Sequence, residues 1–104
     1  MHIMEIMLSD NVHSNLTRMG ARLRAERLAR NEPQARFAAR LGVSVPTLRR
    51  LEQGDASAQI GLWLTALEVL GRLQEVEALL APRYSLFDAA AEAPKTRQRA
   101  RRRA

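Results

Sequence analysis

Hydrophobic and polar positions early in the chain follow the period of an amphipathic helix. The pattern predicts a helix over residues 15–30, with apolar side chains near one stripe and arginines on the opposite face. Ser14 or Asn15 is the expected N-cap, and Pro33 ends the segment because the residue before a proline avoids the α region. Residues 1–14 fit a strand, a helix or an unstructured leader. The predicted apolar stripe consists of Leu16, Met19, Leu23 and, less regularly, Leu28.

Two short helices separated by a glycine are predicted next. The first covers residues 34–41, and Gly42 stops it because glycine readily takes a positive φ. Ser44 is the expected N-cap of the second helix, with Pro46 in its first turn and Gly54 at its end. The apolar positions that anchor this pair to the core are Phe37, Ala38, Leu41, Val43, Leu48 and Leu51.

The segment after these helices is the most apolar part of the chain. Residues 60–70 predict a fourth helix that is apolar nearly all round, and residues 73–80 predict a fifth helix before Pro82. Trp63 is expected in the core. One stripe of the fourth helix can face a core, so its surplus apolar surface predicts a dimer. The expected dimer-interface residues are Leu62, Trp63, Leu70 and Leu73.

Composition supports an all-α fold and excludes several kinds of site. A chain of 104 residues fits one small domain, and with 4% aromatic residues its core must be mainly aliphatic, which favours packed helices. The absence of cysteine excludes disulfides and thiolate metal sites, and two histidines alone do not make a zinc site. We expect no metal, no cofactor, no signal peptide and no membrane span.

The net charge of +6 is unevenly distributed. Six basic residues lie within residues 95–103, whereas residues 18–50 hold nine arginines against two glutamates. Residues 51–94 instead hold two arginines against seven acidic residues. A cationic segment beside an acidic one predicts one face for a polyanion and another face for a different partner.

Two short helices joined by a tight glycine turn are the geometry of a helix-turn-helix. In this motif the first helix braces against the backbone of a DNA duplex and the second enters the major groove. Residues 34–54, QARFAARLGVSVPTLRRLEQG, resemble the Xre/Cro/CI family of helix-turn-helix regulators, and the similarity extends to residues 22–30 and 60–80. The resemblance implies a five-helix, lambda-repressor-like DNA-binding domain. The charge run and the composition of the last residues predict a disordered basic C-terminal tail after it.

The residue pattern and the resemblance together predict a division of the chain. A leader of uncertain structure covers residues 1–14, a Cro/CI-type helix-turn-helix domain covers residues 15–81, and a flexible arginine-rich tail covers residues 82–104. For the tail, three readings remain open: a solvated segment without a specific role, an arm along DNA, and a localisation or docking segment.

Roles of single residues follow from the same resemblance. It implies a structural ion pair between Arg27 and Glu52. Gln34 is expected to clamp a phosphate, Arg49 to contact phosphate and Arg50 to donate a bidentate pair to guanine. Val45 and Pro46, the first two groove-facing positions, depart from the polar residues that are usual in the family. Neither side chain can hydrogen-bond a base edge. The expected DNA-binding residues are Gln34, Ser44, Val45, Pro46, Thr47, Arg49 and Arg50.

The stretches RLGVSVPTLRRLEQGD and LEVLGRL are most similar to antitoxins of the HipB kind. That similarity implies a repressor that autoregulates a toxin–antitoxin operon, binds operator DNA as a homodimer and binds a HipA-like kinase toxin. The alternatives are a stand-alone Xre-type regulator and a protein-interaction adaptor with a degenerate helix-turn-helix. We expect no enzyme, because the sequence shows no nucleophile–histidine arrangement and no glycine-rich phosphate loop. The expected location is the cytoplasm of a bacterium, on nucleoid DNA.

Overall fold

The computed structural model describes residues 7–83, and the regular structure in this range is helical throughout. The predicted all-α class is therefore confirmed, while the predicted disordered tail lies almost entirely outside the described residues. The chain divides after Gln74 into two compact units. The elements are the α-helices α1 (Asp10–Ala29), α2 (Gln34–Leu41), α3 (Val45–Glu52) and α4 (Ile60–Val69), and the 3-10 helix η1 (Leu73–Ala78).

Helix α1 begins five residues earlier than predicted, at Asp10. Ser9 is its N-cap, and the Ser9 hydroxyl accepts a hydrogen bond of 3.1 Å from the Val12 N–H. The predicted caps lie inside the helix, where the Ser14 hydroxyl accepts from Arg18 and the Asn15 amide donates to a backbone carbonyl one turn earlier. The predicted start was wrong because several suitable capping residues precede the first apolar stripe.

The buried stripe of α1 also differs from the prediction. Met19 and Leu28 are 40% and 47% exposed, whereas the buried residues are Gly20, Leu23 and Arg27. These three positions follow the helical repeat and face the rest of the fold. The prediction failed because it counted apolar side chains only, and the core-facing side of α1 includes a glycine and a paired arginine.

The turn between α2 and α3 agrees with the prediction. Gly42 has a φ of 77°, and its N–H donates to the Ala39 carbonyl at 3.1 Å. The Val43 N–H donates to the Ala38 carbonyl at 3.0 Å, which completes a Schellman motif. Ser44 then caps α3 by accepting a hydrogen bond of 3.2 Å from the Thr47 N–H. Two helices are thereby joined by three residues.

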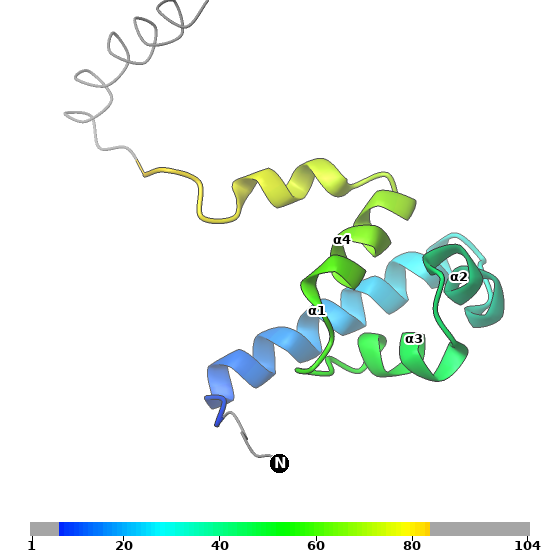
Figure 1. The fold of residues 1–104 in the computed structure, drawn as a ribbon, viewed down its shortest axis with the longest axis horizontal. Coiled ribbons are helices and arrows are strands. Elements are labelled where there is room, and N and C mark those ends of the chain that lie inside the picture. The colour runs from blue at the N-terminus through cyan, green and yellow to red at the C-terminus, as the bar shows by residue number, and fades with distance from the viewer. Residues whose placement is uncertain (1–6, 84–104) are drawn as a thin grey trace, which may run out of the picture. The chain divides into compact units, whose positions relative to one another are not determined.

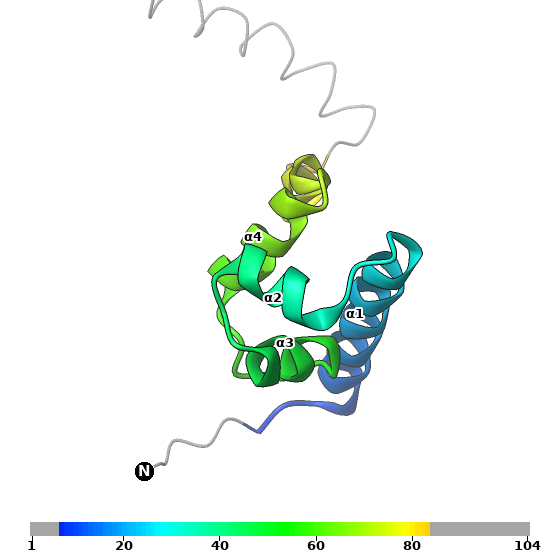
Figure 2. The same ribbon diagram turned by 90° about the vertical axis from the view of Figure 1, so that its right-hand side faces the viewer.

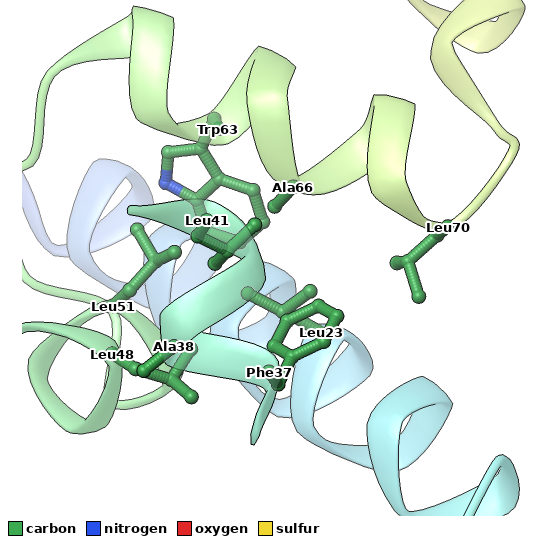
Figure 3. Packing of buried hydrophobic residues seen from close by; sticks show 9 residues of the cluster. All are labelled: Leu23, Phe37, Ala38, Leu41, Leu48, Leu51, Trp63, Ala66 and Leu70. Carbon is green, nitrogen blue, oxygen red and sulfur yellow. The ribbon is translucent and has the colours of Figure 1, made fainter. Parts of the chain in front are cut away.

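Helix α3 packs against both α1 and α2, and α4 packs against α2. Figure 1 and Figure 2 show α2 and α3 gathered beside the long α1 helix. Figure 3 shows the buried side chains converging from the four helices. Phe37 and Leu48 are fully buried at the centre of this core, as predicted. The complete cluster is Leu23, Phe37, Ala38, Leu41, Leu48, Leu51, Trp63, Ala66 and Leu70.

The apolar segment that follows α3 differs from the prediction in its last element. The predicted fifth α-helix is a 3-10 helix without a buried residue. In addition, Trp63 and Leu70 keep only 8% and 6% of their surface exposed, because both belong to the core of their own chain. These two residues therefore present little surface, and their expected place in a dimer interface stays a prediction. Within residues 7–83, no helix is long and apolar enough to cross a membrane.

Candidate nucleic-acid interface

The solvent-facing side of α3 is a single, mainly polar and cationic stripe. Leu48, Leu51 and Glu52 are buried, which fixes the rotation of this short helix. The exposed positions are spaced three and four apart, as expected for one helix face. Gln53, the C-cap of α3, lies on this stripe and is not among the site residues predicted from the sequence. The exposed stripe consists of Pro46, Arg49, Arg50 and Gln53.

A buried ion pair fixes α3 to α1. The Arg27 Nε donates to Glu52 Oε2 at 2.7 Å and Nη2 donates to Oε1 at 3.0 Å, so the contact is bidentate. The two side chains are only 5% and 3% exposed. The hydrogen bonds to Glu52 raise the pKa of Arg27 above its ordinary value and outweigh the lowering effect of burial. The structure thus brings together the two residues that the resemblance pairs.

The same ion pair reaches the loop before α2 and the first residue of α2. The Arg27 Nη1 donates to the carbonyl of Glu32 at 3.0 Å. The Gln34 amide donates to Glu52 Oε1 at 3.4 Å from its half-buried position. Gln34, the expected phosphate clamp, is therefore hydrogen-bonded to the Glu52 carboxylate, which also fixes α3 to α1.

Two glycines, which the sequence analysis did not single out as contact positions, let the backbones of α1 and α3 meet. A Cβ added at Gly20 of α1 would lie 2.5 Å from the Glu52 carbonyl oxygen. A Cβ added at Gly54 would lie 2.7 Å from the Leu16 carbonyl oxygen, and Gly54 has a φ of 84°. Because real Cβ atoms do not approach backbone so closely, any larger residue forces the helices apart. A glycine inside a predicted helix was the available signal.

The predicted groove-facing residues do not share one environment. Val45 is partly buried and packs against the core, so much of its side chain is unavailable to a base. Pro46 is exposed. The hydroxyl of Ser44 donates to the Thr47 hydroxyl at 3.0 Å, so both are engaged within the helix start. The side chain of Arg49 is exposed and has no polar partner among residues 7–83.

The arginines of the cationic segment serve different purposes. Arg27 is buried, Arg30 donates to the Leu70 carbonyl at 2.9 Å, and Arg40 donates to both carboxylate oxygens of buried Glu32 at 2.7 Å. These three side chains hold helix ends together. The cationic face is consequently smaller than the sequence count suggests. Within residues 18–50, the exposed arginines whose side chains have no polar partner in the described part of the chain are Arg22, Arg24, Arg36 and Arg49.

Acidic and histidine side chains do not gather into a metal site in the described range. No group of three or more potential metal ligands is found among residues 7–83. The exposed side chains of Arg49, Arg50 and Gln53 offer cationic groups and hydrogen-bond donors, which suit phosphate oxygens and base edges.

A three-residue turn between two short helices, with an outward arginine stripe on the second helix, defines a DNA-binding helix-turn-helix protein. In a comparison with protein families, the helix-turn-helix domain family matches residues 18–80. The chain belongs to this family. No curated protein and no solved structure gave a significant match.

Proposed function

We propose that this chain is a sequence-specific transcriptional repressor that places α3 in the major groove of operator DNA. The observation that carries the proposal is the exposed stripe on α3 with Arg49 and Arg50, held by a buried bidentate ion pair. A recognition element must present its side chains rigidly, because a loose helix loses discrimination between bases.

The contacts divide into positioning and reading. Arg49 is unrestrained and suits a phosphate, whose position on the duplex does not depend on sequence. Arg50 suits a guanine, because a guanidinium matches the O6 and N7 acceptors of that base. Gln34 lies at the start of α2, where a side-chain amide can reach the backbone of the duplex. Pro46 supplies an apolar contact for a thymine methyl group.

A dimer follows from the small size of one module. One recognition helix reads too few base pairs to find a site in a genome, and a two-fold dimer places two of them about 34 Å apart. Ile60 is 66% exposed on α4, and Leu73 is 39% exposed. We propose that these residues, with the half-buried Leu62, form the dimer contact. Ile60→Glu should shift full-length protein to monomer in sedimentation equilibrium, whereas Leu28→Glu on exposed α1 surface should not.

The test of the main proposal is selection from a random duplex library by the full-length protein. A repressor of this kind enriches one motif, with two half-sites related by two-fold symmetry. A pool that stays random after several rounds, while the protein remains folded by circular dichroism, contradicts sequence-specific binding and favours the adaptor alternative.

The more specific role of an antitoxin rests on sequence resemblance alone. Its partner is expected to be a HipA-like kinase toxin, and the alternative is a regulator without such a partner. Co-expression of the chain with the product of the adjacent reading frame, followed by co-purification, distinguishes the two. Copurification of a kinase-like protein supports the antitoxin role, and its absence from a purification that retains the bait supports the stand-alone regulator.

A further inference from the structure

Arg50 is restrained, unlike its neighbour Arg49. The Arg50 Nη2 donates to the Thr47 hydroxyl one turn earlier at 3.2 Å. On its other side, the Arg50 Nε lies 3.8 Å from Asp55 Oδ2, which makes an ion pair between α3 and the loop that follows it. The Asp55 N–H also donates to the Arg50 carbonyl at 3.1 Å. Two side chains and one backbone contact therefore surround this arginine.

Asp55 is itself fixed in place. The Ser57 N–H donates to Asp55 Oδ1 at 3.0 Å, and the Ser57 hydroxyl lies 2.9 Å from Oδ1 and 3.1 Å from Oδ2. The hydrogen bonds from the backbone and the hydroxyl of Ser57 lower the pKa of Asp55, and nearby Arg50 adds a smaller contribution in the same direction. The carboxylate is consequently charged at neutral pH and held at one place in the loop.

The aliphatic stem of Arg50 borders an open recess, so packing restrains it little. Polar contacts therefore hold the side chain in place. The recess has a volume of about 320 Å³, and Arg50 and Asp55 line it together with apolar residues of α3, α4 and the intervening loops. The Arg50 side chain is 58% exposed. Without Asp55 and Thr47, a long side chain beside such a recess would sample many rotamers.

We propose that Asp55 is a specificity-determining residue, which orients Arg50 toward a guanine and weakens binding to all other DNA. This inference rests on the proposed function. With Nε turned toward Asp55 and one Nη2 donor on Thr47, the Nη1 donors and the second Nη2 donor remain for the O6 and N7 acceptors of guanine. Asp55 does not touch the base.

The sign of the charge makes the proposal distinctive. A carboxylate near the duplex repels phosphates, so by itself it lowers affinity for every sequence. Its benefit arises only through Arg50, whose attraction to Asp55 strengthens when docking excludes water. Removing the charge should therefore raise non-specific affinity while it reduces discrimination. If Asp55 had a purely structural role, removing its charge would lower both the non-specific affinity and the discrimination between bases.

Four full-length variants separate these effects. Asp55→Asn removes the charge but keeps an oxygen that accepts from the Ser57 N–H. Ser57→Ala keeps every charge and removes the hydroxyl that fixes Asp55. Arg50→Ala identifies the base position that Arg50 reads. Glu68→Gln, on an exposed α4 residue without a polar partner among residues 7–83, is the control for the same change in net charge.

The measurement is selection from the random duplex library, followed by titration of the selected site and of a random-sequence duplex. Arg50→Ala should abolish the preference at one position in each half-site. Asp55→Asn should weaken that same preference by roughly three- to tenfold, with random-duplex affinity unchanged or higher. Ser57→Ala should weaken the base preference at this position less than Asp55→Asn does, and Glu68→Gln should leave the preference intact.

Two results overturn the inference. An Asp55→Asn pool that matches the wild-type pool shows that Asp55 does not act on Arg50. Preferences that weaken at all positions together, with lower affinity for the random duplex, show a structural role instead. If the wild-type protein selects no motif, the proposed function fails and this inference fails with it, so the two failures are distinguishable.

Discussion

The helix-turn-helix pair α2–α3 and the apolar segment α4–η1 use their hydrophobic residues in opposite ways. The eight-residue helices α2 and α3 each bury three residues and leave their other positions mainly polar. Helix α4 is far more apolar, yet it buries only Trp63 and Ala66, and η1 buries none. Apolar content therefore does not locate the core. The core follows from amphipathic spacing, and the surplus apolar surface is the basis of the proposed dimer contact.

A core truncation in α2 should have the largest effect and should mark this difference most clearly. Phe37 has no exposed surface, so Phe37→Ala should lower the free energy of unfolding by about 3–5 kcal/mol. Leu79 is 66% exposed, and Leu79→Ala should change it by less than about 0.5 kcal/mol. Urea denaturation of both variants measures this. Equal losses would show that the C-terminal segment contributes to the monomer's core.

Loss of one partner of the buried ion pair should be nearly as damaging. Glu52→Ala leaves the Arg27 guanidinium buried without its acceptor, which should lower the free energy of unfolding by about 3–5 kcal/mol. The double replacement Arg27→Met with Glu52→Leu should recover most of that loss, because two apolar side chains fill the site without a buried charge. A double variant no more stable than Glu52→Ala would contradict this explanation.

The glycine contact between α1 and α3 should give a smaller effect with a matched control. Gly20→Ala places a methyl group against the Glu52 carbonyl and should lower the free energy of unfolding by about 1–3 kcal/mol. Gly61 of α4 has nothing within 4 Å of an added Cβ. Gly61→Ala should raise the free energy of unfolding by about 0.5–1 kcal/mol, because alanine is the better helix former. Thermal unfolding followed by circular dichroism distinguishes the two signs.

The smallest effect should appear in the titration of Asp55. The contacts with Ser57 lower the pKa of Asp55 in the folded state. The Asp55 carboxylate therefore stabilises the folded state at pH values above the pKa that Asp55 has in the unfolded chain. That contribution is lost as the pH falls through the lowered folded pKa. Carbon NMR of the carboxyl group should show a pKa below the ordinary aspartate value, and Ser57→Ala should raise it. An unchanged pKa in Ser57→Ala would show that the hydroxyl does not hold the carboxylate.

The helix-turn-helix itself could be predicted from local signals. Gly42 and Ser44 fix the turn by their own conformational and capping preferences. The predicted bounds of α2 and the predicted turn therefore agree with the structure. The start of α1 could not be fixed, because Ser9 competes with later capping residues. The 3-10 geometry of η1 was not predicted, since an α-helix and a 3-10 helix share similar apolar spacing over six residues.

The candidate site was only partly accessible from the sequence. The ion pair between Arg27 and Glu52 came from family resemblance, since residues 25 positions apart carry no local signal of contact. The restraint on Arg50 depends on a loop conformation that places Asp55 and Ser57 beside it. Such contacts require the tertiary structure. The arginine count likewise did not separate structural cations such as Arg40 from those available to a ligand.

The central claim is tested most directly by the affinity of a double variant, Arg49→Ala with Arg50→Ala, for the selected DNA site across a salt series. Its affinity should fall by at least about tenfold, and the slope of log K against log salt should flatten by roughly 0.9 for the lost phosphate contact. The charge-matched variant Arg22→Ala with Arg24→Ala on α1 should lose less affinity, because no contact with a base is assigned to either residue. A folded double variant on α3 that binds the site as tightly as wild type would contradict the account.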